Sequence, residues 1–461
     1  MGFKDLMKKG TKDAIVKTGL SLLEKNPEKN VERLFTVIRK GIKDDLTRDG
    51  IEKIEQYYKE VPSIKEYVED ILKNTNSIAL KKFFSNFVSN AIWYGVPKRE
   101  KEGERHDTKI PFTILISPSM RCNLSCEGCY AGNYSKDDDL PYKEVDRLIE
   151  EARSLGIYYI IILGGEPFFN KYMLKIYEKY KDVYFTPFTN GTLFDVELVE
   201  KLTSLGNVMP MFSLEGFKKD TDKRRSKGVF DSVMKGMDLL KEKGVPFGVS
   251  TATGKYNIDT VTSHKFIDMI IDKGARMIWY FMFMPVGNNP KEEMDYMLTP
   301  EQRLKLGETT RKIRTSKKIF AIDFFNDAPY VGGCIAGKYY CHINSKGDLE
   351  PCIFSHFATD NILNKSLVDA FKSPYFKELR KRQPYNQNLL MPCPMIDNPK
   401  ELRKIVKDTG AKATHPSAEL MVTDKEFMNK LDKLSNDFKP YAEKAYKEEF
   451  NNKGNYEMSK G

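Results

Sequence analysis

The stretch Arg121-Cys-Asn-Leu-Ser-Cys-Glu-Gly-Cys-Tyr-Ala-Gly132 contains the cysteines Cys122, Cys126 and Cys129 in the spacing C-x3-C-x2-C. It follows a short apolar segment that runs from Phe112 to Ile116. Thiolates at this spacing bind three corners of a cubane iron–sulfur cluster and leave the fourth iron open for chemistry. A zinc site made of the same thiolates, with or without a histidine, and a set of buried free thiols are the alternative interpretations.

Short β-rich runs alternate with amphipathic helical stretches downstream of residue 112. The runs cover residues 112–116, 158–163, 183–188, 208–212, 247–251 and 277–284. Six such β/α units predict a parallel sheet with right-handed crossovers and helices on its outer side. Because barrel enzymes collect their chemistry at the carboxyl ends of strands, the residues just after each run are the candidates for a site.

Polar and glycine-rich motifs follow these runs. Gly164-Gly165-Glu166-Pro167 comes after the second, where two glycines permit close backbone approach and Pro167 suits the first turn of a helix. Ser213 and Glu215 follow the fourth run and face one side of an extended strand end. The other motifs are the turn Thr189-Asn190-Gly191-Thr192, the pair Arg224-Arg225 ahead of Gly228-Val-Phe230, the threonines Thr251 and Thr253, and Pro285-Val286-Gly287.

The cysteine spacing and the order of these motifs together resemble the radical S-adenosylmethionine (SAM) enzymes. The resemblance covers about residues 108–399 and implies an α/β fold, a partial (β/α)6 TIM-like barrel. It implies that SAM chelates the open iron through its amino acid end. One electron from the cluster then cleaves SAM to a 5′-deoxyadenosyl radical, which abstracts hydrogen from a substrate.

The same resemblance assigns residues to the two cofactors. Cys122, Cys126 and Cys129 ligate the catalytic 4Fe–4S cluster. The Gly164-Gly165-Glu166-Pro167 motif holds the SAM amino group, Ser213 and Glu215 bind the ribose hydroxyls, and Arg225 faces the SAM carboxylate. Val286 and Gly287 lie where an adenine ring stacks, and the SAM site is completed by Asn190 and Thr251.

A second group of cysteines, Cys334, Cys341, Cys352 and Cys393, follows the predicted barrel. It resembles the auxiliary-cluster extension called SPASM, or its shorter form called twitch, and four thiolates suffice for one further 4Fe–4S cluster. Cys341 lies on a run whose alternation also suits a buried apolar residue, and a zinc site is a second interpretation of the group. His342 and His356 either ligate iron or take part in hydrogen-bonded packing.

These signals divide the chain into five parts. We expect a helical amino-terminal domain over residues 1–97, a charged linker over 98–110, the barrel over 111–290, the auxiliary iron–sulfur region over 291–399, and a helical cap over 400–461. The helix before residue 95 has a wide apolar face between Ile78 and Trp93. That face packs on the barrel or, in a second interpretation, makes peripheral contact with a lipid surface or a partner.

Composition indicates a globular cytoplasmic protein. The 461 residues are 40% hydrophobic and 30% charged, and the charges at Lys4, Asp5, Lys8 and Lys9 argue against a signal peptide. The seven cysteines are an odd number, which suits metal ligation in a reducing compartment better than a disulfide framework. The net charge of +10 fits solvated helices and anionic cofactors better than nucleic-acid binding.

The sequence therefore predicts an oxygen-sensitive radical SAM oxidoreductase or maturase that takes electrons from a flavodoxin- or ferredoxin-type reductant. A peptide or protein is the expected substrate, because relatives with SPASM extensions frequently modify peptides; a lipid or a small metabolite is the alternative. A different class remains open: an iron–sulfur protein that only transfers electrons, or a SAM-binding regulator without turnover. The strand-end motifs argue against that class, because electron transfer needs no nucleotide pocket.

Overall fold

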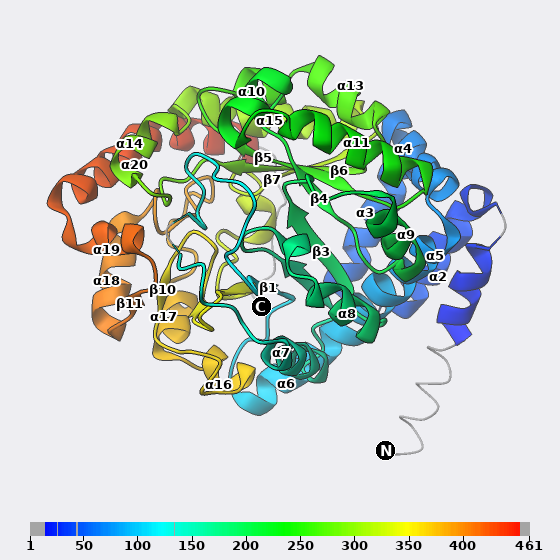
Figure 1. Cartoon of the computed structure of the whole chain (residues 1–461), viewed down its shortest axis with the longest axis horizontal. Helices are drawn as coiled ribbons and strands as arrows, with labels where there is room; N and C mark the ends of the chain where they lie inside the picture. Colours follow the sequence, from blue (N-terminus) through cyan, green and yellow to red (C-terminus); the bar gives the residue numbers. More distant parts are fainter. Residues whose placement is uncertain (1–13, 25, 43–44, 133, 452–461) are drawn as a thin grey trace.

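A nine-stranded sheet forms the centre of the protein, for which we analysed a computed structural model (Figure 1). The structure describes residues 14–24, 26–42, 45–132 and 134–451. The strand order is β7-β6-β5-β4-β3-β2-β1-β8-β9, and every neighbouring pair is parallel except β8 with β9. The strands are β1 Thr113–Ile116, β2 Tyr159–Ile162, β3 Tyr184–Thr189, β4 Met211–Ser213, β5 Gly248–Thr253, β6 Met277–Met282, β7 Phe320–Asp323, β8 Tyr340–Ile343 and β9 Leu349–Glu350.

The predicted partial (β/α)6 barrel is confirmed, and the structure adds a strand at each of its edges. β7 extends the barrel beyond β6, and β8 pairs in parallel with β1 from the other side. At the seam between these two edges, the rings of Phe324 and Tyr340 contact each other with 5.5 Å between their centroids. The sequence reasoning missed β7 because Phe320–Asp323 has only four residues and ends in a charged one.

Helices cover the outer face of the sheet (Figure 1). Outward-facing strand residues such as Ile114, Ile160 and Ile278 are completely buried beneath them. The barrel helices and short turns are α7 Tyr142–Ser154, η3 Pro167–Phe169, α8 Tyr172–Lys179, α9 Val196–Leu205, α10 Lys218–Arg225, α11 Val229–Glu242, α12 Ile258–Val261, α13 His264–Asp272, α14 Pro290–Glu293, η4 Met294–Tyr296 and α15 Pro300–Ser316.

The inner face of the barrel is packed differently. Along β6, Ile278, Tyr280 and Met282 are buried toward the helices, whereas the alternate residues Trp279 and Phe281 keep part of their surface exposed. Side chains inside a filled barrel form a packed core. The partial exposure of large aromatic residues on the inner face therefore indicates a hollow interior.

The amino-terminal helices pack against the barrel. They comprise η1 Pro27–Asn30, α2 Val31–Gly41, α3 Asp45–Glu60, α4 Pro62–Asn74, α5 Ser77–Lys82, η2 Phe83–Tyr94 and α6 Gly95–His106. Asn86 of η2 donates hydrogen bonds to the carbonyls of Lys181 and Val183, just before β3. The Phe87 ring meets Tyr159 of β2 edge-on at 5.3 Å. The first interpretation of the apolar face is thus confirmed: it packs on the barrel at the amino-terminal ends of β2 and β3.

The linker expected over residues 98–110 is wrong in its first part. Residues 95–106 form α6, which continues directly from η2, although Gly95 and Pro97 predicted a helix end. Pro97 is the third residue of α6, just after the chain changes from the wider π-helix η2 to an α-helix. The chain turns only at Asp107, whose backbone is left-handed with φ of 49°.

The remaining elements surround the second cysteine group. They are η5 Ala328–Val331, β10 Phe357–Ala358, α16 Leu367–Phe371, α17 Pro374–Arg382, α18 Pro399–Thr409, β11 Lys412–Ala413, α19 Pro416–Thr423, α20 Lys425–Tyr446 and η6 Lys447–Asn451. The turn predicted at Asn344–Gly347 joins β8 to β9 and is confirmed. A buried ion pair of Arg303 with Asp397, 2.6 Å long, joins α15 to this region. The predicted frayed end after Asn451 lies outside the described residues.

Candidate active site

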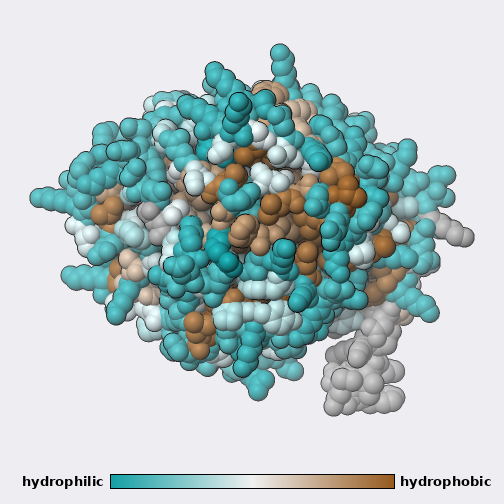
Figure 2. Space-filling view, viewed as in Figure 1, coloured by the Kyte–Doolittle hydropathy of each residue, from teal (hydrophilic) through white to brown (hydrophobic). Residues whose placement is uncertain are grey.

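One large cavity connects the cysteine loop, residues 119–132, with the inside of the barrel. Its volume is about 1810 Å³, and Cys122, Cys126 and Cys129 all line it. Figure 2 shows apolar surface gathered near the centre of the face viewed in Figure 1, within a polar surround. Drug-sized ligands occupy pockets of roughly 300–1,000 Å³, so this cavity has room for a nucleotide cofactor and a second molecule.

The cysteine loop is fixed against the Gly164-Gly165 segment. The N–H of Gly165 donates to the Ser119 carbonyl at 2.9 Å, and the N–H of Glu166 donates to the Arg121 carbonyl at 2.9 Å. A Cβ at Gly165 would lie 2.0 Å from the Arg121 carbonyl oxygen, and Gly164 has a positive φ of 108°. Side chains are therefore excluded here, and the backbone approach predicted for these glycines is present.

Glu166 lies beneath this contact and does not line the cavity. Its carboxylate accepts hydrogen bonds from the Thr189 hydroxyl at 2.8 Å, from the Asn190 N–H at 2.7 Å and from the Phe168 N–H at 3.1 Å. Burial raises the pKa of Glu166 to about 7, and these hydrogen bonds oppose the shift. Glu166 thus ties the end of β2 to the end of β3, and direct contact with the SAM amine stays a prediction.

Glu215 is fully buried and faces two arginines. Arg224 Nη1 and Arg225 Nε each donate to Oε1 of Glu215 at 2.7 Å, and the Ala252 N–H donates to Oε2 at 3.2 Å. Burial raises the pKa of Glu215, but the arginines outweigh it and hold the pKa below its usual range. Both arginines line the cavity, so the unit brings positive charge to the cysteine loop.

The other predicted SAM residues lie at the same end of the barrel. The Asn190 side-chain amide is 3.6 Å from the Cys122 sulfur. Ser213, Thr251 and Val286 line the cavity. Two predicted residues lie just outside it: Pro167 opens η3, and Gly287 abuts the cysteine loop, where an added Cβ would lie 2.9 Å from the Gly128 Cα.

The three thiols line one end of the cavity, although among the described residues no three His, Cys, Asp or Glu side chains converge closely enough to hold a metal ion. Burial raises the pKa of the Cys126 thiol, and the nearby Arg225 and Arg224 oppose this shift. Metal coordination deprotonates thiols, and the two guanidinium groups favour the resulting negative charge. The residues around the cysteine loop are therefore chemically suited to an anionic iron–sulfur cluster with SAM beside it.

The second cysteine group separates into three and one. Cys334, Cys352 and Cys393 line a small apolar cavity of about 240 Å³, together with Tyr340, whose hydroxyl donates to the Cys352 sulfur at 3.0 Å. Cys341 alternates to the other face of β8, where it is completely buried in the main core. Burial raises the pKa of the Cys334 thiol to about 12. Three of the four predicted auxiliary ligands therefore line one cavity, and Cys341 lies outside it.

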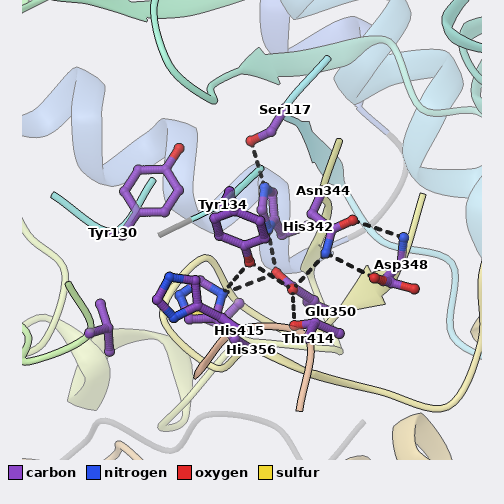
Figure 3. A network of polar contacts seen from close by, with 12 residues as sticks. Ser117, Tyr130, Tyr134, His342, Asn344, Asp348, Glu350, His356, Thr414 and His415 are labelled. Carbon is purple, nitrogen blue, oxygen red and sulfur yellow. Dashed lines mark hydrogen bonds and ion pairs between the residues drawn. The ribbon is translucent and has the colours of Figure 1, made fainter. Parts of the chain in front are cut away.

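Both predicted histidines belong to a buried polar network under the cysteine loop (Figure 3). Its centre is the Glu350 carboxylate of β9. His342 Nδ1 lies 2.7 Å from Glu350 Oε2, and Tyr134 donates to Glu350 Oε1 at 3.1 Å. His356 Nδ1 lies 2.8 Å from the Tyr134 hydroxyl. The hydrogen-bonded interpretation of these histidines is confirmed, and the network joins the auxiliary region to the barrel.

His415, beside this network, predicts a pH dependence of stability. Burial and the neighbouring His356 lower the pKa of His415 to about 3, from an ordinary value near 6.5. Because protonation of His415 favours the unfolded chain, the stability that the neutral imidazole contributes is fully present above pH 6.5. It is lost progressively as the pH falls from 6.5 to 3. We expect the urea midpoint of His415→Gln to vary less with pH across this window than that of the wild type. Parallel curves would contradict the burial argument.

Arg224 and Arg225, the pair that resembles the segment facing the SAM carboxylate, share the Glu215 carboxylate. Sequence reasoning missed another part of the site. The aromatic residues inside the barrel, among them Phe188, Trp279 and Phe324, also line the cavity. Their strand alternation was visible in the sequence, but alternation does not reveal whether the inner face is filled or hollow.

Comparisons with known proteins agree with this architecture. Residues 116–268 match the family model of the radical SAM superfamily, and residues 334–394 match the SPASM iron–sulfur cluster-binding domain. The Fe-coproporphyrin III synthase of Methanosarcina barkeri is 28% identical over 229 residues, 47% of this chain and 57% of that protein. The AdoMet-dependent heme synthase of the same organism is 25% identical over 301 residues, 59% of this chain and 86% of that protein.

Among solved structures, Streptococcus suis SuiB bound to S-adenosylmethionine aligns with a TM-score of 0.55 and 20% identity. The alignment covers 65% of this chain and 76% of SuiB. SuiB has also been solved bound to the precursor peptide SuiA. At this level of identity the likeness shows a shared fold.

Proposed function

Since the chain contains a radical SAM domain followed by a SPASM iron–sulfur cluster-binding domain, we propose that it is an enzyme that abstracts hydrogen from a substrate held inside its barrel. The observation that carries this proposal is the shared cavity. Three cysteines, the Glu215-Arg224-Arg225 unit and the hollow barrel interior all meet in one space. An electron-transfer protein would need no such interior.

In this proposal the cysteines at the end of the barrel hold the catalytic cluster. When bound, the reduced cluster supplies the electron that cleaves SAM to methionine and a 5′-deoxyadenosyl radical, which takes a hydrogen atom from the substrate. Glu215 orients Arg224 and Arg225 toward the cysteine loop, where their charge favours the SAM carboxylate. Asn190 and Ser213 provide hydrogen-bonding groups on neighbouring strand ends for SAM.

Cys334, Cys352 and Cys393 are proposed to hold an auxiliary cluster beside the substrate. Their cavity shares Trp279, Phe324 and Tyr340 with the large cavity, so the two spaces adjoin. A flavodoxin- or ferredoxin-type protein is the proposed electron donor. In these positions the residues would keep both metal centres within reach of a molecule in the barrel.

The comparisons support two different classes of substrate. A peptide or protein, the substrate predicted from the sequence, has support from SuiB, which has a similar fold and was solved with a precursor peptide. The sequence relatives include a heme synthase and an Fe-coproporphyrin III synthase, whose names concern tetrapyrroles. Each class would fill the barrel interior differently, and the lining of that interior is the basis for choosing among them.

The proposed reaction is tested without knowledge of the substrate. Anaerobically reconstituted protein, reduced with dithionite in the presence of SAM, is expected to release 5′-deoxyadenosine and methionine in equal amounts, measured by liquid chromatography with mass spectrometry. Reduced flavodoxin should replace dithionite. Full cluster occupancy with bound SAM and no 5′-deoxyadenosine under either reductant would contradict the proposal and favour a SAM-binding regulator.

Glu215→Gln is expected to weaken SAM binding about tenfold or more while leaving the iron content unchanged. The substitution keeps the volume of the side chain but removes the charge that orients two arginines, and a charge-assisted hydrogen bond contributes roughly 1.5–3 kcal/mol. Equilibrium dialysis with radiolabelled SAM measures the affinity. Glu200→Gln, at an exposed carboxylate of α9, is the matched control. Wild-type affinity in Glu215→Gln would remove the arginine pair from the SAM site.

A further inference from the structure

The cavity runs the length of the barrel. At the carboxyl ends of the strands it is lined by Cys122, Gly164 and Ser213, and at the amino-terminal ends by Phe112, Thr113 and Tyr339. β2 connects the two levels from Tyr159 to Gly164, a path of about 17 Å at roughly 3.3 Å per residue. A molecule that enters at the amino-terminal end would therefore reach the cysteine loop by passing through the barrel.

Apolar side chains line the middle of this path. They form what we call the apolar belt, Leu115, Ile161, Phe188, Trp279, Phe281 and Phe324, which lies between the two polar ends. Several of its rings contact one another, for example Trp279 and Phe281 at 5.3 Å. A peptide in this segment would bring backbone N–H and C=O groups into a lining with few polar partners, at a cost for each group left unpaired. A hydrocarbon chain carries no such groups.

The amino-terminal opening is rich in positive charge. Lys109, Lys338, Lys377 and Lys381 line it, and among the described residues none of them forms an ion pair with a carboxylate. Lys109 and Lys338 lie over the Tyr339 ring, at 5.5 and 5.1 Å from its centroid. We call this group the basic mouth. The acidic residues of the rim, Glu100, Glu104 and Asp107, come from α6 and the turn after it.

We propose that the substrate is a long acyl chain with an anionic head group, whose head binds the basic mouth and whose chain passes through the apolar belt toward the cysteine loop. This inference rests on the proposed function and names its substrate class. It combines two observations: an apolar passage about as long as the barrel is deep, and a group of lysines without carboxylate partners among the described residues at the end remote from the cysteines. Hydrogen abstraction would then occur far from the head group.

The location of a bound chain can be measured by tryptophan fluorescence. The chain has two tryptophans, and Trp93 lies buried in the amino-terminal helices. In reconstituted Trp93→Phe protein, Trp279 of the apolar belt is the remaining reporter. Stearate with a nitroxide in the middle of its chain is expected to quench Trp279 more strongly than stearate with a nitroxide next to the carboxylate. Equal quenching by both, or none, would overturn the proposed orientation.

The basic mouth is tested by charge reversal. We expect the Lys338→Glu/Lys377→Glu/Lys381→Glu variant to bind stearate at least about tenfold more weakly than wild type at low salt, with a smaller difference at high salt. Stearyl alcohol, which has no charge, should bind both proteins equally. The matched control is Lys143→Glu/Lys235→Glu/Lys265→Glu, at exposed lysines of α7, α11 and α13 outside the cavity. Unchanged stearate affinity in the mouth variant overturns the inference.

Further binding experiments distinguish among the candidate substrates of the cavity. Vesicles of phosphatidylglycerol, compared with phosphatidylcholine vesicles and with free stearate, show whether the anionic head belongs to a membrane lipid or a free fatty acid. Saturable binding of coproporphyrin III or of a peptide that depends on the mouth lysines, without binding of any acyl chain, overturns the inference. Release of 5′-deoxyadenosine without acyl-chain binding would reject this inference alone, whereas acyl-chain binding without SAM cleavage would reject the proposed function.

Discussion

Replacing Cys122, Cys126 and Cys129 together by alanine is expected to abolish reductive SAM cleavage and to remove about half of the iron. Anaerobically reconstituted wild-type protein should hold two 4Fe–4S clusters, about eight irons per chain, because each cysteine group suits one cubane. The three thiols lie at the end of the barrel beside the arginine pair, apart from the auxiliary cavity. Iron and sulfide analysis and quantification of 5′-deoxyadenosine measure the two effects.

The metal analysis also tests the alternative interpretation as a zinc site. Wild-type protein with about four irons and stoichiometric zinc would show that the second cysteine group binds zinc. Retention of SAM cleavage in the triple-alanine variant would contradict the assignment of the catalytic cluster outright. Far-UV circular dichroism of the variant serves as the control for folding, since none of the three cysteines is buried in the main core.

The second large effect separates Cys341 from its three neighbours. Removing Cys334, Cys352 and Cys393 together should eliminate the auxiliary iron and abolish product formation, while reductive SAM cleavage without substrate persists. Cys341→Ser should keep the full iron content, because its thiol faces the main core on the opposite side of β8. Iron content and electron paramagnetic resonance spectra of the reduced proteins measure the difference.

Cys341→Ser carries a second expectation, which concerns stability. A hydroxyl that is buried without a partner costs roughly 1–3 kcal/mol, so the variant should unfold at lower denaturant concentration while retaining both clusters. Cys341→Ala would separate loss of packing from loss of a ligand. Loss of the auxiliary iron in both variants would contradict the placement of Cys341 and restore a set of four ligands.

The sequence predicted the barrel because its signals are local. Each strand shows an apolar run, each helix an amphipathic period, and Cys122, Cys126 and Cys129 lie within a few residues of one another. What it could not predict depends on contacts across the fold. The role of Glu166 as a brace depends on Asn190 in the next strand-end motif, and the exclusion of Cys341 depends on the face of β8 that carries Tyr340 turning toward Cys352.

The continuation of η2 into α6 shows a limit of a different kind. Gly95 and Pro97 are signals of a helix end, yet the first turn of a helix tolerates both, so the same residues fit a stop or a new start. Packing decided between them: Arg99 of α6 is buried and donates to the carbonyls of Ala91 and Gly156. No local pattern contains the position of Gly156, which lies after α7.

The auxiliary cysteines lie on segments near the seam between β7 and β8, so a metal that they bind would also stabilise the barrel. Cys334 lies on the segment that crosses from β7 to β8, whereas Cys352 follows β9 and Cys393 follows α17. A metal held by all three would cross-link distant points of the chain. Such a cross-link stabilises the fold mainly by lowering the conformational entropy of the unfolded chain. Loading iron should therefore slow amide hydrogen exchange in β7 and β8 more than in β3 and β4. Metal insertion would then be the step that holds these two edge strands together and closes the barrel.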